Sequence, residues 1–293
     1  MVMIIIKSEK KDMLIKLLKL VITVCISLCV LLTSSEAALE SSNLLESALS
    51  MLPENHIIIQ LYNKKADALL KARFKGGLPY YFAGTNYDYI LKPRYPQQES
   101  GYFKLDRAYL YGFDCKGFTR WVYKEGGLME HPSLQSILTN NYGKINLQSK
   151  YPKKFKDTLH VGDLLVINYG ARHVMMYIGT LRDYGAEIYP ELDNYLDYPL
   201  VIHCGNNPFY YDYYKEHIEN KKMRMKVFPP DGGVTVSLLY VDNLDSTLTR
   251  KDLRGRNFNY IKIDKSIISF INLDNVIDMK WWRSKDKIVF TSY

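Results

Sequence analysis

One cysteine and two histidines have the residue types that nucleophilic catalysis needs. Cys115 stands where a loop is expected to give way to a helix, His173 where a strand is expected to begin, and His203 where a strand is expected to end. A cysteine nucleophile needs a base close by, and the base needs a third polar group that fixes its tautomer. The pattern predicts Cys115 as nucleophile, His173 as base and His203 as the orienting group. Spacing alone leaves open that each histidine is a packed or exposed bystander.

The segment around Cys115 predicts a helix that begins at the cysteine. Gly112 interrupts the chain before Asp114-Cys115, apolar residues follow at helical spacing, and Gly126-Gly127 ends the helix. A thiol at a helix N-terminus lies beside unpaired backbone N–H groups and the positive end of the helix dipole, so we expect a lowered thiol pKa. The backbone N–H of the same cysteine is the expected oxyanion donor. The alternative is a buried cysteine that serves as a small apolar residue.

Strand patterns supply the elements that must hold the two histidines. Apolar runs at 164–167 and 174–178, joined by a turn with Gly170, predict a β-hairpin whose second strand opens at His173. A third short strand carries His203 near its end, and residues 231–241 predict a further strand. A helix packed on such an antiparallel sheet can bring strand ends together beside the helix N-terminus.

Composition indicates an ordinary globular protein, with 47% apolar and 24% charged residues. The net charge of +8 is spread along the chain, and its small lysine clusters lack the interleaved aromatic residues of an RNA-binding sheet. We therefore expect no nucleic-acid partner, whereas an anionic polymer would suit the basic surface. Tyr is abundant, with 25 residues, which weakly favours flat, polar or sugar-like ligands.

Residues 1–37 are typical of a secretory signal segment. Lysines precede an apolar run over 20–32, and Ser35-Glu36-Ala37 offers small residues for cleavage after Ala37. The run is short for a membrane span, so an uncleaved anchor is the alternative. We expect a secreted or cell-envelope protein that contacts the membrane only through this segment. Removal of the signal segment leaves two cysteines, Cys115 and Cys204, which we expect to be free.

Three further regions complete the chain. Residues 38–75 are expected to form two helices, the second from Ile57 to Lys75 with Gly76-Gly77 as its stop. Residues 85–108 are polar and aromatic and predict a long loop before the cysteine helix, which is uncommon unless the loop has a function. Residues 242–293 alternate apolar and polar side chains and predict a small β-rich extension without an assigned role.

Short motifs follow one another in an order that resembles a known family. They are Pro79-Tyr80 with Gly84, Asp114-Cys115-Lys116-Gly117-Phe118, Gly162-Asp163-Leu164, His173-Val174 through Tyr177-Ile178-Gly179, and His203. This order resembles the NlpC-type peptidases, papain-like enzymes of bacterial cell walls. The resemblance covers about residues 66 to 241 and gives the cysteine and the two histidines the same catalytic roles. Asp163 is expected to form a turn rather than to act in catalysis.

The resemblance also implies a substrate class. It implies hydrolysis of peptide bonds in peptidoglycan stem peptides, typically the γ-D-glutamyl bond to a diamino acid, without a metal or other cofactor. In members that need a free N-terminal L-Ala, residues that match Asp114 and Tyr80, together with a serine after the cysteine, hold the substrate amine. Lys116 replaces that serine with a cation, which either favours an acidic group or points to solvent. These three are the candidate substrate-binding residues.

The sequence therefore predicts a papain-like α+β fold, with a helical N-terminal part packed on an antiparallel β-sheet and a small β-rich C-terminal extension. The expected domains are a signal peptide at 1–37, N-terminal helices at 38–75, the catalytic domain at 76–241 and the extension at 242–293. The predicted protein is a monomeric, secreted cysteine endopeptidase acting on peptidoglycan stem peptides. Two alternatives stay open: an amidase or acyltransferase on the same fold, and a catalytically silent wall-binding protein.

Overall fold

A computed structural model describes the parts of the chain that surround the candidate site. The described residues are 44–74, 76–80, 84–86, 112–128, 133–139, 152–168, 172–206, 232–240, 248–251 and 257–284. The predicted signal segment and most of the predicted loop at 85–108 lie outside them. Within the described part, no helix is long and apolar enough to cross a membrane.

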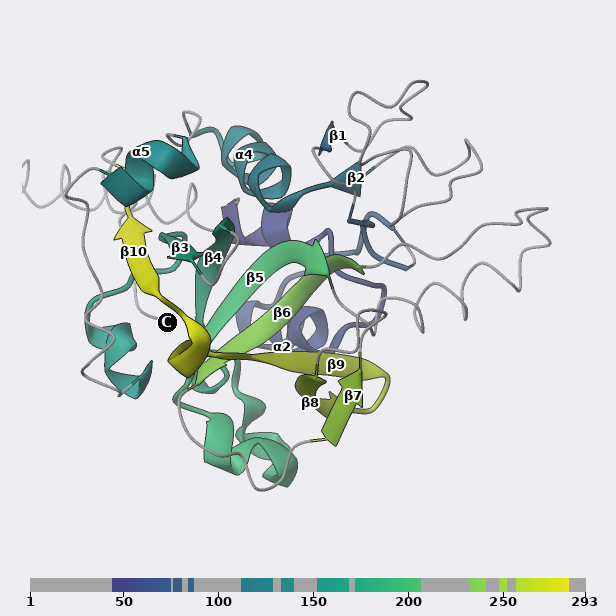
Figure 1. Ribbon diagram of the computed structural model, residues 1–293. Helices are drawn as coiled ribbons and strands as arrows, with labels where there is room; N and C mark the ends of the chain where they lie inside the picture. The colour runs from purple at the N-terminus through teal and green to yellow at the C-terminus, as the bar shows by residue number, and fades with distance from the viewer. Residues whose placement is uncertain are drawn as a thin grey trace, which may run out of the picture.

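The protein is a mixed α and β structure built on a large, mainly antiparallel sheet (Figure 1). The strand order in the sheet is β10-β3-β4-β5-β6-β9-β8-β7, and only the β6–β9 pair is parallel. The strands are β3 (Leu164–Asn168), β4 (Arg172–Thr180), β5 (Pro199–Asn206), β6 (Gly232–Tyr240), β7 (Leu248–Lys251), β8 (Asn257–Ile263), β9 (Ser266–Asn272) and β10 (Asp278–Trp282). The predicted hairpin is confirmed as β3–β4, and the predicted strands at His203 and at 231–241 are confirmed as β5 and β6.

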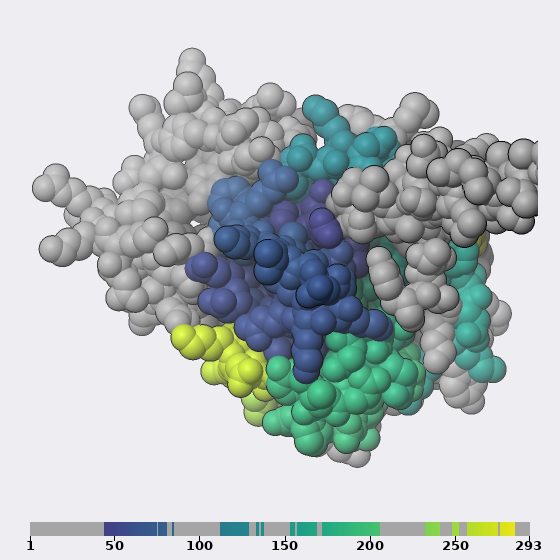
Figure 2. Space-filling model, turned by 180° about the vertical axis from the view of Figure 1, so that it is seen from behind, coloured from purple at the N-terminus to yellow at the C-terminus, as the bar shows by residue number. Residues whose placement is uncertain are grey.

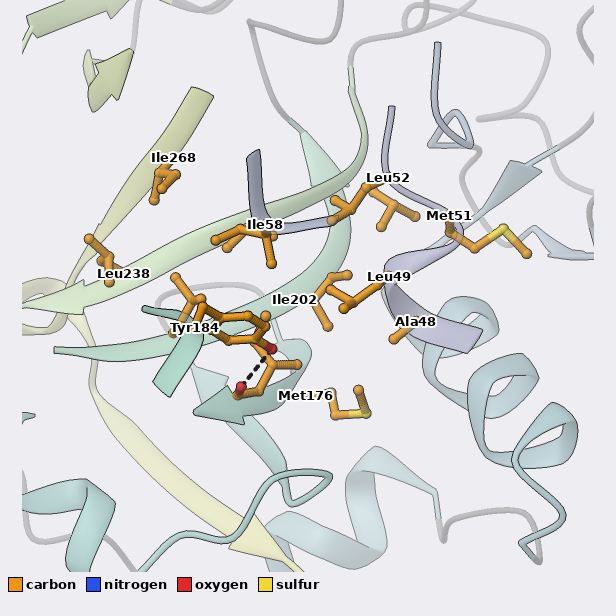
Figure 3. Close-up of a cluster of buried hydrophobic side chains, with 14 of the residues drawn as sticks. Ala48, Leu49, Met51, Leu52, Ile58, Met176, Tyr184, Ile202, Leu238 and Ile268 are labelled. Atoms are coloured by element: carbon orange, nitrogen blue, oxygen red, sulfur yellow. Dashed lines mark hydrogen bonds between the residues drawn. The ribbon is translucent and has the colours of Figure 1, made fainter. Parts of the chain in front are cut away.

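Both faces of the central strands are buried, because alternate side chains enter two different cores. In β3, Leu164 and Val166 join the larger cluster, whereas Leu165 and Ile167 join the smaller one on the other face. The larger cluster also contains residues of the helices that cover its face. Figure 3 shows this cluster, with Leu49 and Met176 near Ile202.

Two N-terminal helical segments contribute to the larger core. Residues 44–49 are helical, and α2 (Ile57–Ala66) buries Ile58 and Leu61. The N-cap residue of α2, His56, accepts a hydrogen bond from the backbone N–H of Ile58 (3.2 Å). The backbone N–H of Ile57 donates to Ser266 Oγ on β9 (2.7 Å), which ties the helix start to the sheet. Figure 2 shows the N-terminal segment (purple to blue) covering the centre of the rear face.

The predicted extent of the second helix was wrong, because α2 ends at Ala66 rather than near Lys75. Asp67 adopts a left-handed conformation (φ 49°) and its N–H caps the carbonyl of Asn63. The Asn63 side chain then forms two hydrogen bonds with the backbone of Leu70, which turn the chain away from the helix axis. Asp tolerates the left-handed region better than most residues, so it can end a helix without glycine.

The cysteine helix is confirmed as α4 (Cys115–Glu125), and a short helix, α5 (Leu134–Thr139), follows it. Asp114 is the N-cap of α4, and its carboxylate accepts from the N–H of Gly117 (2.6 Å). Phe118 and Val122 are fully buried against the sheet. The helix is therefore fixed at its start by a cap and along its inner face by packing.

The C-terminal strands belong to the same sheet as the rest. The β9 strand lies beside β6, with β8 and β7 beyond it, while β10 lies beside β3 at the opposite edge. After β10, the Arg283 guanidinium forms two hydrogen bonds with the buried carboxylate of Asp163 (2.8 and 2.6 Å) and one with the carbonyl of Thr158 (2.9 Å). The segment predicted as an extension is thus structurally continuous with the strands that carry the histidines, and the domain boundaries at 75 and 241 stay predictions.

Candidate active site

Backbone hydrogen bonds hold the segment around Tyr80 next to the start of the cysteine helix. Strands β1 (Thr85–Asn86) and β2 (Gly112–Phe113) form a small antiparallel ladder, and the Asp114 N–H donates to the carbonyl of Gly84 (3.1 Å). The Tyr80 N–H donates to the carbonyl of Gly232 (2.8 Å), so this segment also bridges to β6. The two motifs that the family resemblance joined are therefore adjacent in space.

The sulfur of Cys115 lies among backbone N–H groups. Hydrogen bonds from the N–H of Val174, of Lys116 and of Cys115 itself all favour the thiolate form. The first two residues of the helix supply two of these donors, as expected at a helix N-terminus. The third comes from β4, from the residue directly after His173. This contact locates the sulfur beside the start of β4.

Strands β4 and β5 separate at this end of the sheet. Their backbone pairing starts with Met176 opposite Ile202 and continues away from the two histidines. His173 on β4 therefore lies beyond the paired region, while His203 on β5 pairs with Thr235 of β6. Because the two strands separate here, the start of the cysteine helix can contact the backbone of β4.

The two histidine side chains contact each other across this gap. His173 Nε2 lies 2.9 Å from His203 Nδ1, and the rings meet edge to face with centroids 4.8 Å apart. Gly205 packs against the pair, since a Cβ added there would lie 3.1 Å from His173 Cε1 and 3.5 Å from His203 Nδ1. The contact occupies Nε2 of His173, so Nδ1 is the ring nitrogen that can accept a proton from a thiol.

His203 makes a second buried contact on its other side. Its Nε2 lies 2.8 Å from Ser237 Oγ on β6, and Ser237 Oγ lies 2.6 Å from Ser269 Oγ on β9. Both serines are buried. The strand containing Ser237 was predicted, but neither serine was recognised as a neighbour of the site. The alternation Val234-Thr235-Val236-Ser237 was the available signal, since it places polar side chains on a single strand face.

The prediction of a lowered thiol pKa was wrong. Burial raises the pKa of the Cys115 thiol to about 12, the charge of Asp114 adds to the rise, and the three N–H donors only partly oppose it. Burial also lowers the pKa of His173 to about 4 and, together with His173, that of His203 well below its usual range. Cys115 and His173 each keep part of their surface exposed. The resting pair is therefore a neutral thiol and a neutral imidazole.

The candidate substrate-binding residues lie at the same helix start, but no contact in the structure assigns them a ligand. Tyr80 and Lys116 are half-buried. Burial raises the pKa of the Asp114 carboxyl, while its bond from Gly117 and the charge of Lys116 oppose the rise. Their roles stay predictions. Among the described side chains, no group of three or more His, Cys, Asp or Glu is placed to hold a metal ion.

The other described cysteine has a structural environment. Cys204 is fully buried on β5, and its thiol donates to the carbonyl of Phe113 (3.1 Å), one residue before Asp114. Both Cys204 and Cys115 are free. Because Cys115 is partly exposed and Cys204 is not, only Cys115 is placed to meet a substrate.

A cysteine at a helix start, beside a histidine that another polar side chain orients, is an arrangement that papain-like cysteine hydrolases share. The NlpC/P60 family model matches residues 77–223, about half of the chain. The chain belongs to the NlpC/P60 family, a papain-like family that generally consists of cysteine peptidases or hydrolases acting on peptidoglycan. Comparisons with curated proteins and with solved structures gave no match. The match ends before β6, so the strands that carry Ser237 and Ser269 lie outside it.

Proposed function

We propose that the protein is a secreted cysteine endopeptidase that hydrolyses peptide bonds in peptidoglycan stem peptides, typically the γ-D-glutamyl bond to a diamino acid. The observation that carries this proposal is the 2.9 Å contact between His173 Nε2 and His203 Nδ1 beside the start of the cysteine helix. Membership of the NlpC/P60 family supports the substrate class. Secretion rests on the signal pattern of residues 1–37.

The first half of the reaction is thiol attack with His173 as general base. The Cys115 sulfur attacks the carbonyl carbon of the scissile bond while its proton moves to His173 Nδ1, because the resting thiol is neutral. The C–S bond forms, and the carbonyl oxygen becomes an oxyanion near the backbone N–H of Cys115. Loss of one such donor typically costs about 3 kcal/mol of transition-state stabilisation.

The second half releases the two products. The tetrahedral intermediate collapses, the C–N bond breaks, and the leaving amine takes the proton from His173, which leaves a thioester on Cys115. Water then attacks the thioester with His173 as base, the C–S bond breaks, and the carboxylate product leaves as the thiol regains its proton. His203 holds the His173 ring in place throughout, through the contact at Nε2.

Substrate recognition is assigned to the residues around the helix start. Asp114 and Tyr80 are proposed to bind the amino end of the stem peptide, since Asp114 directly precedes Cys115 and Tyr80 pairs through its backbone with Phe113. Lys116 is partly exposed and lies close enough to Asp114 for their charges to interact. A cation at this position opposes the binding of a free amine and favours an acidic substituent.

The test is mass spectrometry of muropeptides after incubation of purified peptidoglycan with the wild-type protein. We expect fragments with a new amino group on the diamino acid. Glycan strands freed of whole stem peptides would instead indicate an amidase, and transfer to an added amine an acyltransferase. Unchanged muropeptides, together with retained binding to cell walls, would support the catalytically silent wall-binding alternative and contradict the proposal.

A further inference from the structure

A buried chain of hydrogen bonds leads from the histidine pair into the C-terminal strands. It runs from His203 Nε2 to Ser237 Oγ (2.8 Å) and on to Ser269 Oγ (2.6 Å), which donates to the backbone carbonyl of Val236 (3.4 Å). His203, Ser237 and Ser269 are each less than 7% exposed, so water competes little for these contacts. The last donor–acceptor distance is the longest of the three.

The sheet register explains why these side chains meet. His203 lies opposite Thr235 on β6, so Ser237 is its diagonal neighbour on the same sheet face. Ser237 in turn lies directly opposite Ser269 in the parallel β6–β9 ladder. The three polar groups therefore follow one another across three adjacent strands. The last of these strands comes from the C-terminal segment.

Either atom can be the donor in the serine–serine and histidine contacts, but a single arrangement of donors also satisfies the carbonyl at the end of the chain. A carbonyl oxygen only accepts, so Ser269 donates to Val236 and accepts from Ser237. Ser237 then accepts from His203, whose proton must lie on Nε2, leaving a lone pair on Nδ1. His173 must donate its Nε2–H to that lone pair. The Nδ1 atom of His173 is thereby left unprotonated, which is the form a general base for Cys115 needs.

We propose that Ser237 and Ser269 are positioning residues that hold His203, and through it His173, in the tautomers that thiol attack requires. The inference rests on the proposed function, because the tautomer of His173 has a kinetic consequence only if His173 is the base. It goes beyond the family match, which ends at residue 223. The C-terminal strands then complete the site instead of forming an accessory unit.

Ser237→Ala removes the acceptor for the His203 Nε2–H. His203 can then carry its proton on Nδ1, where it donates to His173 Nε2 and forces the His173 proton onto Nδ1. We expect kcat to fall by about 10- to 100-fold, a fraction of what general-base catalysis contributes, with KM changed less than about threefold. Ser237→Thr keeps the hydroxyl, so this variant is expected to retain most of the wild-type kcat. Ser269→Ala is expected to have a smaller effect, since Ser237 still accepts from His203.

A matched control is available on the same strand as Ser269. Ser266 is also buried, but its hydroxyl accepts from the backbone N–H of Ile57 and belongs to the contact with α2. Ser266→Ala is expected to lower the melting temperature without changing kcat. If Ser237→Ala and Ser266→Ala lower stability alike and both leave kcat unchanged, the serine pair is structural only and the proposal is wrong.

The decisive measurement is the nitrogen NMR spectrum of the histidine rings, which does not depend on activity. In the full-length wild type we expect protons on Nε2 of both His173 and His203, with Ser237→Ala shifting them to Nδ1. A wild type with the proton on Nδ1 of His203 would overturn the proposal, even if Ser237→Ala does not fold. If the tautomers shift as expected but Cys115→Ala retains turnover, the positioning holds and the proposed function fails.

Discussion

His173 Nε2 lies 2.9 Å from His203 Nδ1, at the point where β4 and β5 have stopped pairing through their backbones. The side-chain contact therefore takes over from the backbone ladder in joining the two strands. The backbone of His173 is held on one side by its pairing with Ile167 of β3, and the orientation of its ring depends on the contact with His203. The histidine pair is both a structural link and the core of the proposed site.

Removing His203 is expected to cost less than removing His173. His173→Ala deletes the base, and we expect kcat to fall by about 10³-fold, within the usual range for general-base catalysis. His203→Ala is expected to lower kcat by only about 10- to 100-fold, because water can partly replace an orienting group. Steady-state kinetics on a defined stem peptide gives both values. The reverse ranking would mean that the two roles are exchanged.

The reactivity of Cys115 toward iodoacetamide is expected to rise continuously with pH. Burial and Asp114 raise the pKa of this thiol to about 12, and the pKa of His173 is lowered to about 4, so no thiolate–imidazolium pair exists at neutral pH. The alkylation rate should increase through about pH 6 to 10 without a plateau, since the thiolate is the reacting form. Cys204→Ser removes the buried second thiol from the measurement. A plateau near neutral pH would reveal a preformed ion pair and contradict this description.

Stability is expected to fall as the pH drops from about 6.5 toward 4. Burial lowers the pKa of His56 to about 4, so between these values the unfolded chain binds a proton that the folded chain excludes. The contribution of His56 is fully present above pH 6.5 and is lost as the pH falls through 4, with a size on the order of 3 kcal/mol. Urea titrations at several pH values measure the slope. His56→Asn should make the slope smaller, and His173 and His203, whose pKa values are also lowered by burial, should account for the slope that remains.

The ion pair between Arg283 and Asp163 is expected to contribute substantially to stability. Asp163 has a side chain only 1% exposed, so Arg283→Ala leaves a buried carboxylate without its partner and should cost roughly 3 kcal/mol of unfolding free energy. The double variant with Asp163→Asn should recover part of that loss. Arg182→Ala, at a solvent-exposed pair with Asp197, should cost clearly less than Arg283→Ala, because water screens the exposed pair. Equal losses for both arginines would contradict the buried pair's role.

The local parts of the site were predictable from the sequence because their signals are local. Gly112, Asp114 and the apolar spacing after Cys115 indicate the start of α4, and the two apolar runs at 164–167 and 174–178 indicate the β3–β4 hairpin. Helix caps and two-strand turns depend on residues within a few positions of one another. The end of α2 is also local, but the left-handed Asp67 resembles an ordinary helical residue in the sequence.

The remaining features depend on contacts between distant residues. Ser269 reaches Ser237 only because β9 pairs in parallel with β6, and nothing near either serine predicts that pairing. The raised pKa of Cys115 has the same origin, since the helix start alone predicts a fall and only the packed structure supplies the opposing burial. Local sequence patterns could therefore name the three candidate catalytic residues, but not the serines behind them or the resting charge state.

The central claim is that Cys115 is the nucleophile. The most direct test is turnover of purified peptidoglycan by the wild type, Cys115→Ala and Cys204→Ser, with circular dichroism to show that each variant is folded. We predict that Cys115→Ala reduces the rate by at least about 10³-fold, because covalent catalysis is lost, while Cys204→Ser, which keeps a donor for the Phe113 carbonyl, stays near the wild-type rate. Turnover by folded Cys115→Ala at a rate close to that of the wild type would contradict the claim.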